Sequence, residues 1–308
     1  MQKELKKEWS AESVESRKLY MLNNELLKYK SKLYRESTRK FNLSNFRVAL
    51  RFLLTGAFSR IVKKVCGIKD AYDMASYTLY PYKQLLSGKV VVYTCIWGGY
   101  DEIIEPVYIN PNVDYIIFTD RDIDPSSAWK KINIPDHSIF KGMTPIEINR
   151  YIKILPHEFL KEYDYSIYVD GNIKIVTDVM PLINDIGDYY IGIHNYPINC
   201  IYKMKDAIIA GKKASANDVK QQIAKYKKEG YPKGYGAFEC NVIVRKHNIP
   251  DCVDLMCKWW EEFTNTTSKR DQLSFMYVLW KSGKKASDVF SLGTDVRQNP
   301  RLQVLKHI

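Results

Sequence analysis

The chain has 308 residues, of which 45% are hydrophobic and 13% aromatic, so it can build a full globular core. Its formal net charge of +12 favours anionic partners such as nucleic acid, acidic lipid or phosphorylated small molecules. No nucleic-acid-binding motif accompanies the charge, so we expect no nucleic-acid partner.

The cellular compartment follows from the chain start and the cysteines. The amino-terminal end is too charged for a secretory signal peptide, and no apolar run reaches the roughly 18 residues of a transmembrane helix. Six cysteines without a Cys-x-x-Cys pair are expected to be buried thiols of a reducing compartment, at Cys66, Cys95, Cys200, Cys240, Cys252 and Cys257. We therefore expect a cytoplasmic protein, or one that lies peripherally at the inner face of the cell membrane.

Residues 1–86 differ from the rest of the chain because they are rich in Lys, Glu and Leu and nearly free of glycine and proline. The pattern predicts a long charged helix at 2–36 and a strongly basic amphipathic helix at 42–65. A basic amphipathic helix can bind an anionic membrane surface. Alternatively, its apolar face packs on the neighbouring domain or on another subunit, and in the latter case the protein is a homo-oligomer. Turn residues then predict a boundary between this helical region and a domain at 87–308.

From residue 89 onward the apolar pattern alternates between strands and helices. Strands are expected at residues 89–96, 114–119, 165–169, 189–193 and 240–245. Helices are expected at residues 145–156, 216–229, 251–263 and 270–281. This alternation predicts an α/β, Rossmann-like domain with a mainly parallel mixed sheet and helices on both faces.

The most informative stretch is the apolar strand at 165–169, which ends abruptly in Asp170-Gly171-Asn172. Ligands bind at the carboxyl ends of strands in open α/β sheets. Oxygen ligands suit Mg²⁺ or Mn²⁺, so Asp170 and Asn172 are candidate ligands of a divalent cation that faces a diphosphate. The alternative is an ordinary turn at a strand end.

The turn after the first strand holds a second group of candidates. Paired glycines let the backbone approach a ligand, and an aromatic ring beside them can stack on a base. The candidate residues for binding a nucleotide sugar here are Thr94, Trp97, Gly98 and Tyr100. Asp120, at the end of the second strand, can accept hydrogen bonds from a base or ribose. A plain tight turn and a capping aspartate are the alternatives.

Arg150 and Lys153 are three residues apart on a predicted helix, so they share one face. They can meet a diphosphate or the carboxylate of Asp170, unless that face is simply solvated. His194 can line the sugar or acceptor pocket, although a lone histidine is more often structural. His307, near the end of the chain, is a candidate metal ligand.

The last constellation is Arg270-Asp271-Gln272, which opens a predicted helix. An aspartate near a helix start satisfies free backbone amides and complements the helix dipole. That explains Asp271, but it does not require Arg270 and Gln272. Together the three side chains offer donors and an acceptor for sugar hydroxyl groups.

These motifs occur in order along the chain, as YTCIWGGYD at 93–101, FTD at 118–120, KILPH at 153–157, YDYSIYVDGN at 163–172 and RDQLSF at 270–275. The combination resembles the TOD/MUCI-type glycosyltransferase-like family over residues 89–285. It is more distantly similar to the retaining glycosyltransferases of the glycogenin and bacterial lipooligosaccharide galactosyltransferase group, which have a GT-A fold.

That distant group implies roles for particular residues. Its Asp-x-Asp motif, which binds Mn²⁺ and UDP, is matched by Asp170 and Asn172, and its later Asp-Gln pair is matched by Asp271 and Gln272 as the catalytic residues. The basic residue before the metal strand is matched by Arg150 or Lys153. Two features depart from the pattern: Asn172 replaces the second aspartate, and the carboxyl-terminal His-x-x-Gly-x-x-Lys-Pro-Trp is absent, with His307 as a substitute.

The resemblance implies a retaining glycosyltransferase that moves a hexose-type sugar from a UDP-linked donor to a glycan or lipid-linked glycan acceptor. The product would belong to a cell-surface polysaccharide such as capsule, O-antigen or lipopolysaccharide. Two alternatives stay open. A nucleotidyltransferase or sugar-phosphate transferase on the same fold would keep phosphate from the donor in its product. A non-catalytic carbohydrate-binding or membrane-docking protein is favoured by the neutral Asn172.

Overall fold

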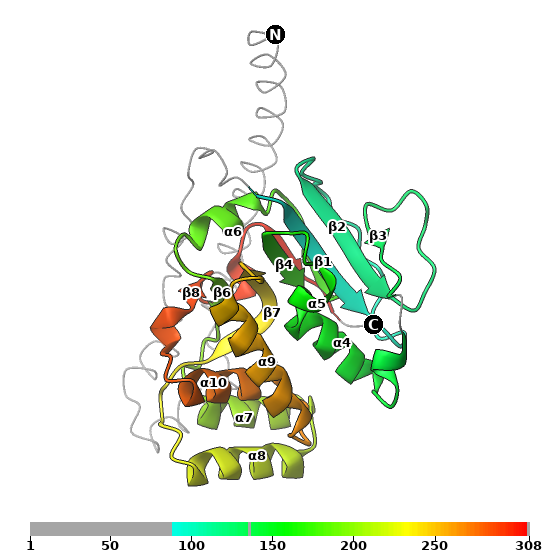
Figure 1. Cartoon of the computed structure of the whole chain (residues 1–308). Helices are drawn as coiled ribbons and strands as arrows, with labels where there is room; N and C mark the ends of the chain where they lie inside the picture. The colour runs from blue at the N-terminus through cyan, green and yellow to red at the C-terminus, as the bar shows by residue number, and fades with distance from the viewer. Residues whose placement is uncertain (1–87, 135–136, 307–308) are drawn as a thin grey trace, which may run out of the picture. The chain divides into compact units, whose positions relative to one another are not determined.

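Seven strands form one mixed sheet in the order β3-β2-β1-β4-β7-β6-β8 (Figure 1). The computed structural model describes residues 88–134 and 137–306. The strands are β1 (Val90–Ile96), β2 (Val113–Thr119), β3 (Lys130–Lys131), β4 (Tyr165–Val169), β6 (Ile191–Asn195), β7 (Phe238–Arg245) and β8 (Phe290–Ser291). Four neighbouring pairs are parallel, whereas β7 runs antiparallel to both β4 and β6.

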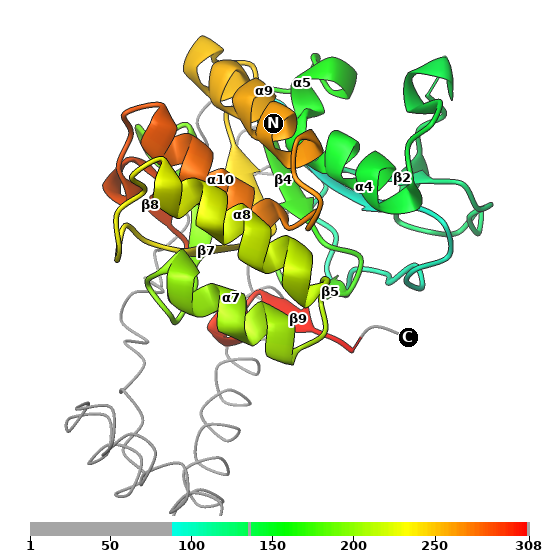
Figure 2. The ribbon, with the colours of Figure 1, turned by 90° about the horizontal axis from the view of Figure 1, so that it is seen from below.

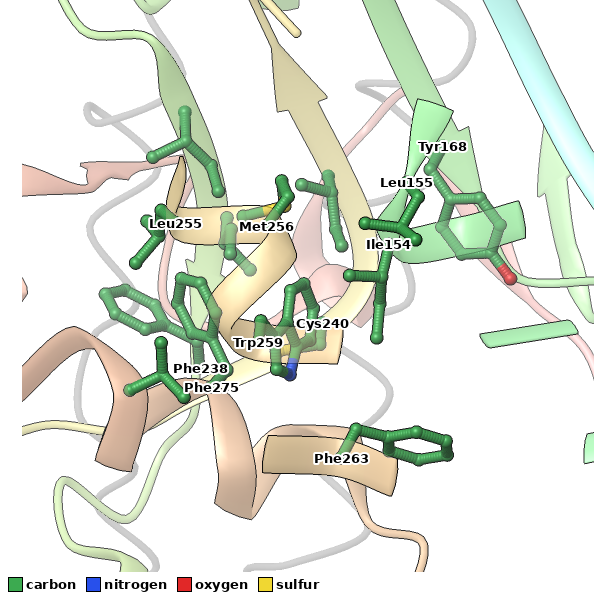
Figure 3. Close-up of a cluster of buried hydrophobic side chains, with 14 of the residues drawn as sticks. Ile154, Leu155, Tyr168, Phe238, Cys240, Leu255, Met256, Trp259, Phe263 and Phe275 are labelled. Carbon is green, nitrogen blue, oxygen red and sulfur yellow. The ribbon is translucent and has the colours of Figure 1, made fainter. Parts of the chain in front are cut away.

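The central strands are buried on both faces, which explains why they read as continuous apolar runs. One face, which includes Tyr93 and Phe118, belongs to the larger hydrophobic cluster with α4 (Pro145–Ile154), α9 (Pro250–Thr264) and α10 (Asp271–Lys281). Figure 3 shows Trp259 of α9 beside Phe238 and Phe275 in this cluster.

The opposite face of the sheet forms a second hydrophobic cluster. There α6 (Met180–Asp185) packs with a two-stranded antiparallel sheet of β5 (Ile173–Ile175) and β9 (Leu302–Val304). The chain therefore returns after α10 through β8, the 3-10 turn η4 (Val296–Gln298) and β9 to the segment that follows β4.

The remaining helical elements add further apolar side chains to the larger hydrophobic cluster. They are α5 (Pro156–Phe159), α7 (Ile201–Ala210), α8 (Ala216–Lys228), η2 (His137–Phe140) and η3 (Ala286–Asp288). Figure 2 shows α7 and α8 side by side. Within the described ranges, none of the helices is both long and apolar enough to cross a bilayer.

The predicted fold class, an α/β domain with a mainly parallel mixed sheet and helices on both faces, is confirmed for the described residues. The helix expected at 145–156 is divided, because Leu155 precedes a proline and leaves the helical conformation before Pro156 begins α5. The strand expected at 189–193 is shifted to 191–195, and α7 was not predicted.

One cysteine prediction is wrong. Cys257 is exposed, whereas Cys252 is buried, because positions five apart on a helix project about 140° from one another. Cys95, Cys200 and Cys240 are buried as expected. The predictions for Cys66, for residues 1–86 with the basic helix at 42–65, and for His307 concern residues outside those that the structure describes.

Candidate functional site

Asp170 lies at the carboxyl end of β4, where its side chain keeps 25% of its surface exposed. The backbone N–H of Asp170 donates to the carbonyl of Asn241 on β7 at 2.8 Å, which fixes the start of the turn. A Cβ at Gly171 would lie 3.0 Å from Ile96 and 3.1 Å from the carboxylate of Asp101, so a larger residue would crowd the turn against β1. The turn thus presents the Asp170 carboxylate at the sheet edge.

The carboxylate of Asp170 is oriented by two donors. The hydroxyl of Tyr168 lies 2.9 Å from Oδ1, and the ammonium of Lys153 lies 3.2 Å from the same atom. Lys153 Nζ also lies 2.7 Å from Asp271 Oδ2, although the Lys153 side chain is only 1% exposed. This buried ammonium therefore joins the end of β4 to the start of α10.

Arg150 completes the network, because its Nε lies 3.1 Å from Asp271 Oδ2. Burial would raise the pKa of Asp271, but the charges of Arg150, Lys153 and Arg270 outweigh it and hold that pKa well below its usual range. Asp271 is consequently a buried carboxylate that neutralises its cationic neighbours. Lys153 therefore contacts the carboxylate of Asp170, as one of the predicted alternatives had it, whereas Arg150 pairs with Asp271 instead.

Gln272, which follows Asp271, contacts β7, and Arg270, which precedes it, contacts Gln272. Gln272 Nε2 donates to the carbonyl of Glu239 at 2.6 Å, and Arg270 Nη2 donates to Gln272 Oε1 at 3.1 Å. The indole of Trp259 donates to the carbonyl of Asp271 at 3.1 Å and fixes the start of α10. The start of α10 therefore lies near Asp170, because Lys153 contacts both Asp271 and Asp170. The spacing of the motifs along the chain did not require this.

Asn172 is 9% exposed and holds the carboxyl-terminal segment. Its Nδ2 donates to the carbonyl of Leu305 at 3.0 Å, and the N–H of Leu305 donates back to the carbonyl of Asn172 at 2.9 Å. The amide is therefore anchored through nitrogen, which leaves Oδ1 as its remaining ligand atom.

The donor set fits a divalent cation only in part. Asp170 and Asn172 supply oxygens, as Mg²⁺ and Mn²⁺ prefer. Among the described residues, no group of three or more His, Cys, Asp or Glu side chains gathers to hold a metal ion. The third predicted ligand, His307, follows Leu305 by two residues and is not among the described residues.

The turn after β1 adopts the conformation that its glycines allow, with φ of 71° at Gly98 and 70° at Gly99. The N–H of Gly98 donates to Asp120 Oδ2 at 3.0 Å, so two predicted residues from neighbouring strands meet here. Tyr100 is 63% exposed next to them. The turn is an open platform beside the end of β2.

Three other predicted residues have more internal positions. Trp97 packs edge to face on Phe140 with ring centroids 5.6 Å apart. Thr94 is buried within β1. His194 is fully buried in β6 with Nε2 2.9 Å from Asn299 Nδ2, and burial lowers its pKa to about 3, so it is neutral. The structure thus places Thr94 and His194 in the protein interior, away from a solvent-facing pocket.

Glu239, at the start of β7, was not predicted as a site residue. Its carboxyl group is buried, which raises its pKa to about 7, and Oε2 accepts the N–H of Val296 at 2.9 Å. The next residue, Cys240, has φ of 56°, a strained value for a residue with a side chain. The available signal was a single acidic residue next to the apolar run of this strand.

A family model described as TOD1/MUCI70, glycosyltransferase-like domain, matches residues 65–307. The probable hexosyltransferase MUCI70 of Arabidopsis thaliana is 22% identical over 263 residues, which cover 74% of this chain. The chain spans only 43% of the length of that protein.

Two solved structures show a more distant likeness. The apo structure of the bifunctional glycosyltransferase WbbM is 12% identical, with a TM-score of 0.45, and the match covers 68% of this chain and 40% of that one. The galactosyltransferase LgtC, in complex with donor and acceptor sugar analogs, is 16% identical, with a TM-score of 0.41 and coverage of 64% and 72%. Because the family model spans most of the sequence, this chain belongs to the TOD1/MUCI70 glycosyltransferase-like domain family.

Proposed function

We propose that the chain is a glycosyltransferase that moves a hexose from a nucleotide-sugar donor to a glycan or lipid-linked glycan acceptor. The observation that carries this proposal is the position of Asp170, a partly exposed carboxylate at a strand end, joined through Lys153 to the Arg270-Asp271-Gln272 motif. Family membership supports the reaction class, and the similarity to MUCI70, a probable hexosyltransferase, supports a hexose.

The roles of the residues follow from their contacts. The Gly98 turn, held by Asp120, gives the base and ribose a platform beside exposed Tyr100. Lys153 and Tyr168 hold the Asp170 carboxylate in one orientation. Electrostatic stabilisation of the departing diphosphate then requires little reorganisation, because these groups are already fixed.

Asp170, Asn172 and His307 would hold a divalent cation, Mn²⁺ or Mg²⁺. When bound, such a cation neutralises negative charge on the leaving diphosphate. Gln272 would contact the sugar ring, and Asp271, which balances Arg150 and Lys153 and accepts the N–H of Gln272, would position it. We propose retention at the reacting carbon. We also propose UDP as the nucleotide, a cell-surface polysaccharide as the product, and a cytoplasmic enzyme whose basic segment at 42–65 contacts the inner face of the membrane.

Incubation of the full chain with a panel of nucleotide sugars and Mn²⁺, followed by measurement of nucleotide release, tests the proposal. One donor should be turned over, and Asp170→Asn should reduce release at least 100-fold, because an oriented carboxylate is lost. The control is Asp254→Asn, which removes an exposed partner of Lys258 on α9 and should retain activity.

The products separate the alternatives. Release of nucleoside diphosphate supports a glycosyltransferase, whereas release of nucleoside monophosphate indicates a sugar-phosphate transferase and release of sugar 1-phosphate indicates a nucleotidyltransferase. Binding of a donor without turnover, in the presence of an acceptor panel, would instead support a docking protein and overturn the proposed function.

A further inference from the structure

Two arginines lie near Glu239, next to the proposed donor site. Arg270 is linked to it through Gln272: Arg270 Nη2 donates to Gln272 Oε1 at 3.1 Å, and Gln272 Nε2 donates to the backbone carbonyl of Glu239 at 2.6 Å. Arg297 Nη1 lies 3.9 Å from Glu239 Oε1. Two cationic side chains from distant parts of the chain therefore converge on the start of β7.

A third cation comes from the connection between α7 and α8, where the two helices lie side by side (Figure 2). Lys213 is an exposed residue of this connection, and it interacts electrostatically with Arg270, Arg297, Glu239 and Asp170. Desolvation lowers the pKa of Lys213, and repulsion from the two arginines lowers it further. Lys213 is thus close enough to both arginines and to Asp170 for their charges to act on it.

The positive charge of this group is incompletely balanced by carboxylates. Among residues 88–134 and 137–306, neither Lys213 nor Arg270 has an ion-pair partner within 4.0 Å, and the buried Nε of Arg270 lacks a hydrogen-bond acceptor. Arg297 is 62% exposed and shares Asp295 and Glu239 at 3.5 and 3.9 Å. Glu239 has a pKa of about 7, so it is only partly ionised at neutral pH. Crowded cations of this kind attract an anion.

We propose that Lys213, Arg270 and Arg297, the cationic group, bind the diphosphate of the nucleotide-sugar donor directly. This inference rests on the proposed function, and it assigns Lys213 and Arg297 a role that no sequence motif gave them. Asn172 supplies a neutral oxygen where a second carboxylate would bind a cation more strongly. The cationic group compensates by neutralising the diphosphate through side chains, so part of the donor affinity is independent of a divalent cation.

The test is calorimetric titration of the full chain with UDP and with GDP, in EDTA and in Mn²⁺, at two salt concentrations. The wild-type chain should bind one of them in EDTA, with affinity that falls as salt rises. Lys213→Gln and Arg297→Gln should each weaken binding in EDTA about tenfold, because each removes a charge-assisted contact to phosphate. The matched control is Lys220→Gln, an exposed lysine on α8, which should bind like the wild type.

The outcomes are separable. Loss of all binding by the wild-type chain in EDTA, or equal affinities for Lys213→Gln, Arg297→Gln and Lys220→Gln, would overturn the cationic group as the diphosphate site. If the wild-type chain still releases nucleotide from a donor in Mn²⁺, the proposed glycosyltransferase function stands despite that result. A wild-type chain that neither binds a nucleoside diphosphate nor turns over a donor would remove both proposals. Thermal melting of each variant confirms that it is folded.

Discussion

The ammonium of Lys153 lies 2.7 Å from the carboxylate of Asp271, although 118 residues separate them in the chain. The same ammonium reaches Asp170, and the carbonyl of Lys153 accepts hydrogen bonds from Arg245 at 2.8 Å and Tyr93 at 2.9 Å. Lys153 is therefore held by backbone and side chain at once. The positions of β4 and α10 relative to each other depend on it.

Replacement of this lysine should destabilise the protein strongly. Lys153→Met leaves Asp271 buried with Arg150 as its nearest remaining cation, and loss of one partner from a buried pair costs about 3 kcal/mol. Urea denaturation measures this loss. Lys130→Met removes an exposed partner of Asp114 and should cost less than about 1 kcal/mol. Equal losses in the two variants would show that burial of the pair contributes nothing.

The Gly98 turn should tolerate no side chain. In Gly98→Ala the new Cβ would meet Pro145 at 2.7 Å, and φ is 71°. Gly142→Ala is the matched control, because its φ of 82° imposes similar strain while nothing lies within 4 Å of its Cβ. We expect the control to lose about 1 kcal/mol of unfolding free energy. Gly98→Ala should lose more and should also weaken nucleotide binding, and identical behaviour of both variants would contradict a close approach at Gly98.

Glu239 should make the protein less stable as the pH rises toward neutrality. Its pKa is about 7 in the folded chain against an ordinary value of 4.5, so the folded state binds the proton more tightly. The stability it contributes is complete below pH 4.5 and is lost as pH rises through 7. Each pKa unit corresponds to about 1.4 kcal/mol.

Glu239→Gln isolates this effect because it keeps an oxygen acceptor for Val296. Unfolding free energies of the two chains should differ by an amount that changes by about 3 kcal/mol between pH 4.5 and 7. The buried histidines contribute equally to both chains and cancel. Glu261→Gln, an exposed change on α9, gives the control curve. Parallel curves for Glu239→Gln and wild type would show that this carboxyl group does not titrate differently on folding.

Asn172→Asp should separate metal binding from anchoring of the carboxyl-terminal segment. The added carboxylate should tighten Mn²⁺ binding about tenfold, as measured by electron paramagnetic resonance. The variant should also melt at a lower temperature without metal, because the donor to Leu305 is lost. Asn248→Asp is the control, because it loses comparable hydrogen bonds from the side-chain amide to the carbonyls of Lys161 and Tyr163 and is not a predicted metal ligand. It should lower the melting temperature without changing Mn²⁺ affinity. Unchanged Mn²⁺ affinity in Asn172→Asp would remove position 172 from the metal site.

The sequence predicted the strands better than their directions. The bounds of β4 are as predicted, because a continuous β-branched run bounded by turn residues leaves few alternatives. The antiparallel direction of β7 was not predicted, since a buried strand has the same apolar pattern in either direction. The helix α7 was missed because its start at Cys200 has no capping side chain to mark it.

The local sequence pattern also determined only part of the candidate site. Linear motifs indicated Asp170, Gly98 and Gln272, because each follows or opens a recognisable element. They did not indicate that Asp271 and His194 are buried, since burial depends on packing against helices and loops that are distant in sequence. Glu239 belongs to no motif, and only the folded chain brings it into contact with Gln272.

The pairing of β4 with β7 also affects how the protein refolds. Val169 pairs with Val242, and Asp170 bonds to Asn241, so the ligand-facing edge exists only after two sequence-distant strands have joined. Contacts of such long range form slowly, because a large loop must close first. After dilution from denaturant, ligand affinity should therefore recover with the slowest phase of refolding. Collapsed folding intermediates should not bind the ligand.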